Sequence, residues 1–200
     1  MAFALIGDVV GSRSLPDRAR AQQTINSALA VVSSAVGASQ PLEPTVGDEF
    51  QGVFSTLGAA ITASLRIRLE LLPHIDVRCG LGQGDITVHD GRRRPILQDG
   101  PAWWAARSAL EQLARPAQRS ARTWFSGLEQ DHVNAYLLVR DALVERFNDR
   151  HLRMLRLALA GRSQAEIAAA ERISRSAVSQ AFSHGVGAVR DAAVIFEGKS

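Results

Sequence analysis

The order of apolar segments over residues 1–88 constrains the fold more than any other feature of the sequence. An apolar run at 3–6 stops at Gly7-Asp8 and predicts a buried strand. Pro16 opens a segment that reaches residue 36 with an approximately helical spacing of apolar side chains. Strands are then predicted at 41–46 and 50–54, around a tight turn in which Gly47 supplies a positive φ.

The same pattern continues in the next segment. Residues 57–72 predict a helix that ends at Pro73, and residues 75–81 alternate apolar and polar side chains like a half-buried strand. The resulting order, β-α-β-β-α-β, is that of the ferredoxin-like arrangement. We expect Gly82 and Gly84 to interrupt the last strand before a short strand at 85–88. The sequence therefore predicts an α+β fold.

The rest of the chain is predicted to be mostly helical. We expect a helix at 102–113, a further strand at 122–125 and a connecting helix at 128–147, followed by helices from 151 onward. These elements divide the chain into an α/β domain at 1–126, a connecting helix at 127–149 and an all-α domain at 150–200.

The net charge of +3 is concentrated at one end of the chain. Residues 151–200 hold seven basic and four acidic side chains, whereas residues 1–150 hold equal numbers of each. A neutral body with a basic end fits a nucleic-acid-binding appendage. The solvated surface of a helix would explain the same charges equally well.

Other features of composition indicate a cytoplasmic protein without a membrane span. No run approaches the roughly 18 apolar residues that cross a bilayer, and the first ten residues carry Asp8 and no basic region, unlike a signal peptide. Cys79 is the single cysteine, so no internal disulfide is possible. Its place in a predicted strand favours a small core residue.

The segment from residue 154 to residue 190 carries the most specific signal. Ser163 and Glu166 have the S-x-x-E spacing of a capping box, which predicts the start of a helix. Ser174 is placed to cap a third helix, on which Val178 and Phe182 point inward.

Short polar side chains and an arginine remain on the exposed side of this helix pair, as suits entry into the major groove of DNA. The sequence pattern Q-x-E-I-A followed by I-S-R-S-A-V-S-Q resembles the helix-turn-helix of bacterial transcription regulators and of sigma-factor region four. A helical hairpin that packs on the body or on a partner is the alternative. The candidate contacts to double-stranded DNA are Ser163, Gln164, Ser174, Arg175, Ser176, Ser179, Gln180 and Ser183.

Two carboxylates near the N-terminus form a candidate metal site. Asp8 ends a predicted strand and precedes small residues whose backbone amides are open, and Asp48 lies in the predicted hairpin turn. The first strand and the hairpin are neighbours in a ferredoxin-like sheet, so the two carboxylates can converge. Such a pair suits Mg²⁺ bound together with nucleotide phosphates. A strand-end cap at Asp8 and an ordinary turn at Asp48 are the alternatives.

These motifs resemble the class III nucleotide cyclase and GGDEF palm superfamily. Asp8 and Gly47-Asp48 match its two metal-binding aspartates, the R-x-G-x-x-x-G strand is matched by Arg78, Gly80 and Gly84, and Ala105-Ala106-Arg107 matches a helix whose arginine contacts phosphate there. The resemblance implies a nucleotide site with Mg²⁺, whose metal ligands would be Asp8 and Asp48. Its nucleotide-binding residues would be Asp8, Val9, Val10, Gly11, Ser12, Asp48 and Arg107.

With the C-terminal helices added, the whole chain resembles the SatD family. It departs from the cyclases where they carry an Asn that orients ribose, since Trp103 stands at that position and Trp104 follows it. Tryptophans in such a place are more often core or interface residues than platforms for a base. No residue is assigned a catalytic role.

We therefore expect a homodimeric, DNA-binding transcriptional regulator whose N-terminal domain senses a nucleotide or dimerises. In that case a ligand would alter the spacing of two recognition helices. The alternative is a metal-dependent nucleotidyl cyclase-type enzyme with a DNA-binding appendage, in which Asp8 and Asp48 hold the metal and Arg107 clamps phosphate. A palm that serves only as a dimerisation scaffold is a third hypothesis.

Overall fold

The computed structural model describes residues 1–118 and 120–198. Its centre is a five-stranded mixed sheet in the order β2-β3-β1-β4-β7. β1 lies antiparallel between β3 and β4, and β7 is added parallel to β4. The strands are β1 (Ala2–Val9), β2 (Gln40–Pro44), β3 (Glu49–Phe54), β4 (Val77–Gly84) and β7 (Thr123–Ser126). The order of the first four strands agrees with the predicted β-α-β-β-α-β arrangement.

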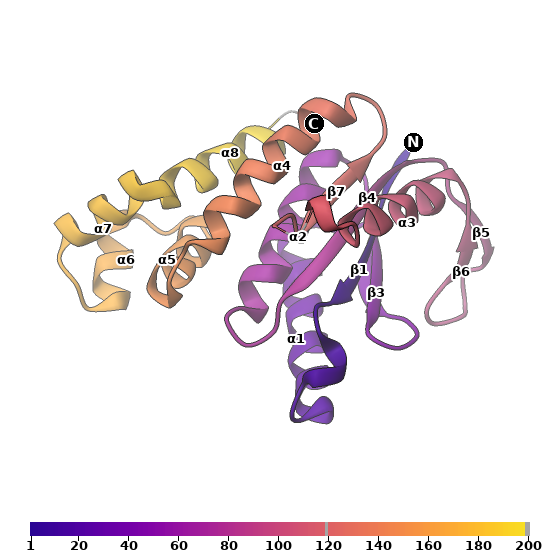
Figure 1. Ribbon diagram of the computed structural model, residues 1–200, viewed down its shortest axis with the longest axis horizontal. Helices are drawn as coiled ribbons and strands as arrows, with labels where there is room; N and C mark the ends of the chain where they lie inside the picture. Colours follow the sequence, from indigo (N-terminus) through magenta and orange to yellow (C-terminus); the bar gives the residue numbers. More distant parts are fainter. Residues whose placement is uncertain (119, 199–200) are drawn as a thin grey trace.

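Helices cover both faces of this sheet (Figure 1). α1 (Arg18–Val36) and α2 (Leu57–Leu71) pack on one face, and α3 (Pro101–Leu113) packs on the other. α4 (Gln130–Glu145) lies along β7 on the side of α2. Smaller elements are the 3-10 turns η1 (Ser12–Ser14) and η2 (Pro116–Gln118) and the hairpin of β5 (Thr87–Asp90) and β6 (Leu97–Asp99).

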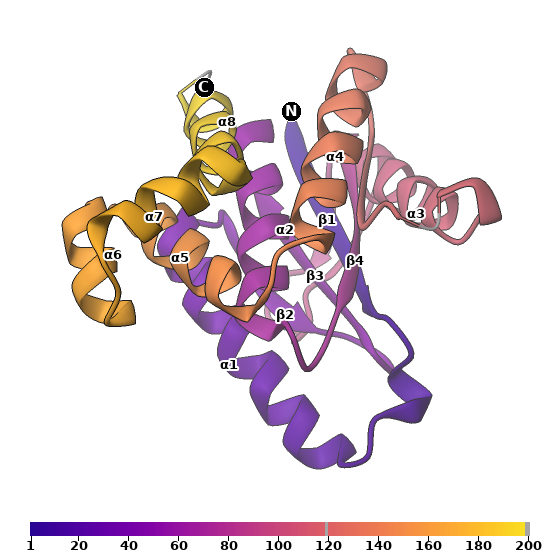
Figure 2. The same ribbon diagram turned by 60° about the vertical axis from the view of Figure 1, so that its left-hand side comes forward.

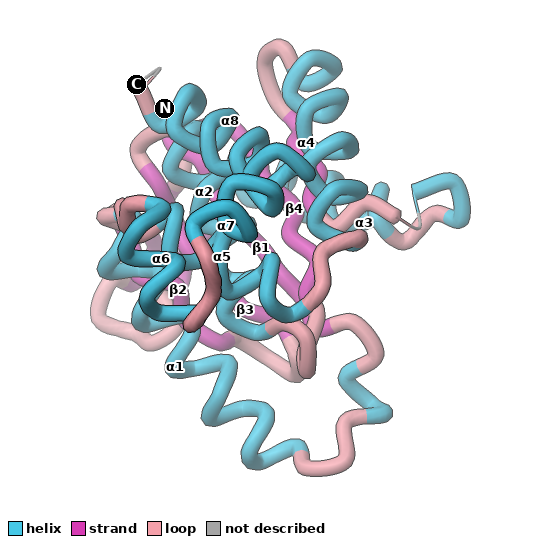
Figure 3. Tube along the Cα trace, turned by 90° about the vertical axis from the view of Figure 1, so that its left-hand side faces the viewer, coloured by secondary structure: helices cyan, strands magenta, loops and turns pink. Residues whose placement is uncertain are grey.

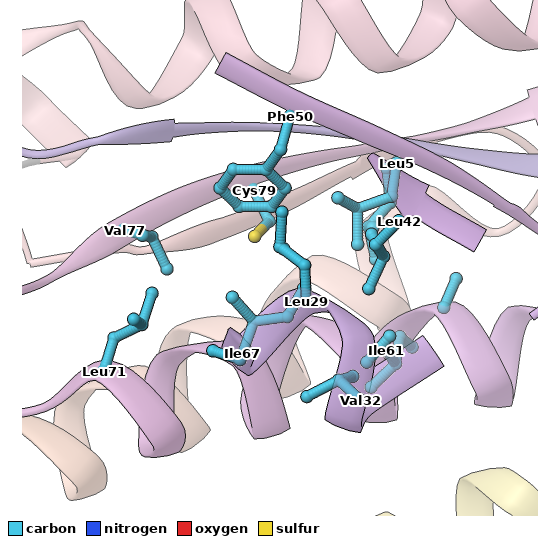
Figure 4. Packing of buried hydrophobic residues seen from close by; sticks show 14 of the residues in the cluster. Leu5, Leu29, Val32, Leu42, Phe50, Ile61, Ile67, Leu71, Val77 and Cys79 are labelled. Atoms are coloured by element: carbon cyan, nitrogen blue, oxygen red, sulfur yellow. The ribbon is translucent and has the colours of Figure 1, made fainter. Parts of the chain in front are cut away.

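The period-two alternation of the strands decides which side chains meet which helices. In β1, Leu5 and Val9 belong to the core shared with α1 and α2, whereas Ala4 and Ile6 belong to the core beneath α3. Figure 4 shows the larger core, in which Leu5 and Phe50 of the sheet face Leu29 of α1. Asp8 therefore shares the α3 face with Ala4 and Ile6.

Glycines of β4 allow α3 to pack directly against the backbone of the sheet. A Cβ atom on Gly80 would lie 2.2 Å from the carbonyl oxygen of Ala106, and one on Gly82 would lie 2.2 Å from that of Ala102. Any larger side chain would push the helix away. The prediction that Gly82 and Gly84 interrupt the strand is wrong, because β4 runs without a break from Val77 to Gly84.

A buried ion pair on α4 joins the helix to the rest of the sheet layer. Arg140 and Asp141 are 2% and 0% exposed. One oxygen of Asp141 accepts bonds from Arg140, and the other accepts the backbone N–H groups of Arg122 and Thr123 at 2.8 and 2.7 Å. Arg140 also donates to the carbonyl oxygen of Ile61 in α2. The pair therefore fixes α4 against both β7 and α2.

A second ion network lies where α2 leads into β4. Asp76 accepts hydrogen bonds from Arg68 and Arg122, and Arg68 also donates to Glu145 of α4. Burial alone would raise the pKa of Asp76, but the hydrogen bonds and charges of the two arginines outweigh it and hold that pKa below its usual value. The carboxylate is thus kept ionised.

The C-terminal helices form a layer beside α2 (Figures 1 and 2). They are α5 (Asp149–Leu159), α6 (Gln164–Glu171), α7 (Arg175–Ala181), the π-helical turn η3 (Phe182–Val186) and α8 (Gly187–Glu197). Their apolar core includes Leu65 and Leu69 of α2 and Val144 of α4. The structure does not isolate this region as a separate domain, because its core is completed by helices of the α/β part.

A kink separates the third predicted helix of this region from α8. His184 and Gly185 have non-helical backbone angles, with a φ of +120° at Gly185. A Cβ atom there would lie 3.3 Å from the ring of Phe147. Figure 3 shows the helices from α5 to α8 in front of α2.

Two further differences from the sequence predictions concern short segments. Asp8 is the last residue but one of β1 rather than its end, because β1 extends to Val9. β6 was not predicted, since its three residues are too few to show an alternation. Among the described residues, no helix combines the length and apolar character needed to span a membrane.

Candidate functional site

Charged side chains gather where β1 ends, on the face of the sheet that α3 covers. Asp8 is the register partner of Glu49 in β3 and of Arg78 in β4. Cross-strand partners lie on the same face of a sheet, about 5 Å apart at their Cβ atoms. The three side chains therefore form a row across β3, β1 and β4, and Arg107 of α3 contacts this row through Glu49.

Asp8 is paired with Arg78 through both of its carboxylate oxygens. Arg78 Nε donates to Oδ1 at 2.9 Å and Arg78 Nη2 donates to Oδ2 at 2.5 Å. The hydrogen bonds that Arg78 donates to Asp8 raise the pKa of Arg78 above its usual value, and the charges of Asp8 and Asp48 add to this effect. Both predicted metal-binding carboxylates thus act on one guanidinium group.

Arg107 is paired with Glu49 in the same bidentate geometry. Its Nη1 and Nη2 atoms donate to the two carboxylate oxygens of Glu49 at 2.7 and 2.8 Å. Hydrogen bonding to Glu49 raises the pKa of Arg107, to which the negative charge of Asp8 also contributes. The predicted phosphate clamp already holds a carboxylate, which occupies the donors that a phosphate would use.

The loop after β1 was predicted to offer its backbone amides to phosphate. The N–H group of Val10 instead donates to the carbonyl oxygen of Asp76 at 2.9 Å, so this amide is engaged within the fold. Gly11 adopts a left-handed conformation with φ of 66° and leads into η1. Within the described residues, no hydrogen bond occupies the amides of Gly11 and Ser12. Of the amides predicted to bind phosphate in this loop, these two are therefore the ones available.

A small hollow lies between this loop and the β2–β3 turn. Its volume is about 40 Å³, and Val9, Ser12 and Asp48 of the predicted site line it together with Arg18 and Gln22 of α1. The sequence did not single out Arg18 or Gln22. The hollow has room for a phosphate-sized group but not for a whole nucleotide, whose pockets span about 300 to 1,000 Å³.

The donor set suits Mg²⁺ only if a ligand supplies further oxygens. In the part of the chain that the structure describes, no three His, Cys, Asp or Glu side chains lie close enough to hold a metal ion by themselves. Mg²⁺ commonly binds through one or two carboxylates, waters and substrate phosphates. Asp48 lines the hollow beside α1, whereas Asp8 lies on the α3 face and is bonded to Arg78, so joint binding of Mg²⁺ by the two carboxylates stays a prediction.

The predicted DNA-binding side chains lie on a different surface. All eight are exposed on α6, on α7 and at their ends, while Val178 and Phe182 are buried beneath them as expected. The predicted capping box is present, since Ser163 accepts from the N–H of Glu166 while Glu166 accepts from the N–H of Ser163. We name this surface the α6–α7 polar face; it comprises Ser163, Gln164, Ser174, Arg175, Ser176, Ser179, Gln180 and Ser183.

The other side chains that the sequence singled out have structural roles. Trp103 is 7% exposed within the core beneath α3, whereas Trp104 is 62% exposed and donates from its indole nitrogen to Asp99. Cys79 is buried in the sheet core, and burial raises the pKa of its thiol. Trp103 is therefore a core residue, whereas Trp104 lies at the surface.

The roles of Glu49 and Arg78 as ion-pair partners at this site follow from the tertiary structure rather than from local sequence. The sequence places Glu49 beside Asp48 and Arg78 in a glycine-containing strand, but neither local pattern says which carboxylate meets which guanidinium. The alternation of side chains along three strands carries that information. It becomes readable only after the strands have been paired.

Comparison with known proteins identifies both a family and a fold. A family model described as the SatD family matches residues 2–179. No curated protein matches the chain. Two structures of a bacterial light-regulated adenylyl cyclase resemble it with TM-scores of 0.50, at 18% and 19% identity. They match 62% of this chain and cover 74% and 42% of the cyclase chains.

The adenylyl cyclase CyaB from P. aeruginosa has a TM-score of 0.44 at 15% identity, over 56% of this chain and 70% of its own. At such low identity, the likeness to the light-regulated cyclase shows the fold alone. That fold is the one found in nucleotide cyclase domains.

Proposed function

The chain belongs to the SatD family, and from this premise we propose that its α/β part is a nucleotidyl cyclase-type site for a purine nucleoside triphosphate and Mg²⁺. The C-terminal helices would be a DNA-binding appendage of this site. The proposal is supported by the cyclase fold and by the row of paired charges at the end of β1. Functionally, we divide the chain at residues 1–126, 127–149 and 150–200, although the parts share a core.

Asp8 and Asp48 would hold the metal ion. They come from β1 and from the β2–β3 turn, and the charge of each acts on Arg78. When bound, Mg²⁺ supplies charge that neutralises the phosphate oxygens and polarises the reacting phosphorus. Arg78 would keep Asp8 oriented, since a bidentate partner restricts the rotation of a carboxylate.

Arg107 would bind the phosphate chain after exchanging its partner. A guanidinium group binds carboxylate and phosphate with the same planar fork of donors. Glu49 therefore stands in for a phosphate when no nucleotide is bound, and it keeps Arg107 in place at the edge of the site. The amides of Gly11 and Ser12 are placed to add neutral donors.

The core position of Trp103 bears on turnover. An indole packed beneath α3 offers no amide to a ribose, so the chain itself must orient the sugar with other groups. The proposal therefore concerns binding of the metal–nucleotide complex first and cyclisation second. Binding and cyclisation can be tested separately, because calorimetry measures the heat of binding and mass spectrometry detects the cyclic product.

The single observation that carries the proposal is the convergence of Asp8, Arg78, Glu49 and Arg107 at one end of a cyclase-type sheet. The test is calorimetry of the full chain with purine and pyrimidine triphosphates and Mg²⁺ or Mn²⁺. We expect saturable, metal-dependent binding that the double variant Asp8→Asn/Asp48→Asn abolishes. Mass spectrometry of the same mixtures would show whether a cyclic nucleotide and pyrophosphate form.

Asp131→Asn provides a matched control, because Asp131 is an exposed carboxylate in the first turn of α4. It should bind nucleotide like the unaltered chain. No heat with any nucleotide, or binding that survives the double variant, would contradict the proposal and leave the α/β part as a scaffold.

A second candidate function, that of a DNA-binding transcriptional regulator, is favoured by the α6–α7 polar face. Arg175 and Gln180 are exposed on a short helix that Ser174 caps, over a core that holds Val178. Polar side chains presented in this way suit base edges in the major groove. Selection from a pool of random duplexes, followed by fluorescence titration at several salt concentrations, would find a preferred sequence if this function is real.

We also propose that the DNA-binding form is a homodimer. A single helix pair makes a small interface, and two of them read two half-sites at a fixed spacing. A nucleotide bound near Asp8 would then change affinity for DNA by altering the dimer. Sedimentation of the full chain with and without DNA checks this, and a monomer at tens of micromolar in both samples would exclude it.

A further inference from the structure

A groove lies at the junction of the α/β part and the C-terminal helices. Its volume is about 680 Å³, and its walls come from the start of α1, the end of α2 with the loop after it, and α5. The groove is distinct from the charged row at the end of β1, whose side chains do not line it.

The two sides of the groove differ in chemistry. Apolar side chains of the α/β part form its inner wall, among them Leu15, Leu72 and Ile75. Arg20 on α1 and Arg156 on α5 line the groove from the two sides, and the carboxylates that also line it are those of Asp17, Glu70 and Asp149. An apolar wall flanked by guanidinium groups suits a ligand that has an apolar body and an acidic group.

Arg156 has donor capacity that the described residues do not use. Its Nε atom is buried without a hydrogen-bond partner among them. Its closest carboxylate is that of Glu70, at 4.0 Å from Nη1. A buried N–H group without an acceptor is rare in native proteins, and an ordered water or a ligand commonly supplies the missing oxygen.

Arg20 adds a second cation on the opposite wall. Its side chain is exposed, and no described residue accepts a hydrogen bond from its guanidinium group. Asp17, which also lines the groove, is occupied at the start of α1, where it accepts the backbone N–H of Arg20. Arg153 of α5 is likewise occupied, by Glu171 outside the groove. Arg20 and Arg156 are thus the cations with donors to spare.

We propose that this groove binds a small organic anion, whose acidic group lies between Arg20 and Arg156 and whose apolar body lies on Leu15, Leu72 and Ile75. The volume falls within the range of small-molecule sites, about 300 to 1,000 Å³. Inorganic phosphate would leave most of that space and the apolar wall uncovered. The ligand therefore carries an aromatic or branched aliphatic group as well as its carboxylate, sulfonate or phosphate.

Such a ligand would contact both parts of the molecule. Arg20 belongs to the α/β part and Arg156 to the C-terminal helices, so one anion between them bridges the junction. A ligand that binds the folded state but not the unfolded state raises the stability of the protein by mass action. The inference is independent of the nucleotide site and of DNA binding.

The probe is 8-anilinonaphthalene-1-sulfonate, which combines an aromatic body with a sulfonate and fluoresces when its body leaves water. We expect saturable fluorescence with one site per folded chain and a higher thermal unfolding midpoint at saturating probe. Arg156→Gln should weaken the affinity by about tenfold, the loss expected for one charge-assisted hydrogen bond. Naphthalene-1-carboxylate should compete with the probe, and inorganic phosphate at the same concentration should not.

Two further variants make the test specific. Thr24 is an exposed residue of α1 that lines the groove. Thr24→Phe should therefore fill the space and abolish binding without removing a charge. Arg93→Gln makes the same chemical change as Arg156→Gln on an exposed arginine between β5 and β6, and should bind the probe normally. Circular dichroism confirms that each variant is folded.

Weaker binding in both Arg156→Gln and Thr24→Phe, but not in Arg93→Gln, supports the assignment. Unchanged affinity in either groove variant overturns it, as does fluorescence that never saturates. Competition by inorganic phosphate as strong as that by naphthalene-1-carboxylate would also overturn it, because it would show that the apolar body contributes nothing.

Discussion

Two of the candidate binding surfaces of this protein differ in what their charged side chains contact. At the end of β1, Asp8 is paired with Arg78, and Glu49 is paired with Arg107. On the α6–α7 polar face, the side chains of Arg175 and Gln180 are exposed, and no described residue forms a hydrogen bond with either of them. The charged side chains at the sheet are therefore paired internally, whereas Arg175 and Gln180 offer their donors to water.

This difference has consequences for binding. A ligand at the sheet must replace an internal carboxylate or guanidinium partner, so part of its interaction energy is offset by the bonds it breaks. A partner of the α6–α7 polar face displaces only water from donors that are already exposed. The sheet site should consequently discriminate strongly by charge, and the helix surface should discriminate by the placement of hydrogen bonds.

The comparison predicts the largest effect where a charge pair is fully buried. Replacing Asp141 with Asn leaves Arg140 without a counter-charge at 2% exposure and disturbs the bonds to Arg122 and Thr123. We expect a loss of about 3–5 kcal/mol in the free energy of unfolding, the usual cost of breaking a buried pair. Urea denaturation followed by circular dichroism measures it.

Asp191→Asn is the matched control, because Asp191 pairs with Arg190 on the surface at 61% exposure. That substitution should change the free energy of unfolding by less than about 1 kcal/mol. Equal losses in the two variants would show that burial does not distinguish the pairs.

An intermediate effect is expected on the α6–α7 polar face. Arg175→Ala and Gln180→Ala should each weaken specific binding to a selected duplex by about 1–3 kcal/mol per lost base contact. Both side chains are exposed, so the free energy of unfolding should stay within about 0.5 kcal/mol. Fluorescence anisotropy gives the affinity. If the altered chains bind that duplex as tightly as the unaltered chain, these residues lie outside any DNA interface.

The smallest effect is expected at Glu49. Its pair with Arg107 is partly exposed, at 31% and 45%, so Glu49→Gln should change the free energy of unfolding by at most about 1 kcal/mol. Because Arg107 would no longer be held by a carboxylate, affinity for a triphosphate with Mg²⁺ should rise by up to about fivefold. Calorimetry measures the rise.

Glu43→Gln serves as the reference for this variant, since Glu43 pairs with Arg94 at 3.6 Å, away from the predicted site. It should leave nucleotide affinity unchanged. Weaker binding in Glu49→Gln than in Glu43→Gln would mean that Glu49 contacts the ligand or metal itself, rather than standing in for phosphate at Arg107.

Much of the fold was readable from local patterns. The period of two in residues 75–81 and the helical spacing of residues 57–72 predicted β4 and α2 to within a few residues at each end. The capping box at Ser163 and the cap at Ser174 marked the starts of α6 and α7. Such signals are local because a strand, a helix turn and a cap each involve residues close in sequence.

Contacts between distant segments were not readable in this way. Gly82 and Gly84 suggested a broken strand, yet together with Gly80 they allow the close approach of α3, a helix that begins at residue 101. Leu65 and Leu69 belong to α2 in the sequence, yet they complete the core of the C-terminal helices. A glycine or an apolar helix face indicates that another segment packs against it, but it does not identify that segment.

The sequence by itself determined the residue types at the candidate sites: carboxylates near residues 8 and 48, an arginine at 107 and a polar helix near 175–183. Only the tertiary structure decided their partners. Asp8 meets Arg78 because antiparallel register places the two residues opposite one another, and Glu49 meets Arg107 because α3 packs on that face of the sheet. Register follows from the packing of whole strands and helices, so no local stretch of sequence contains it.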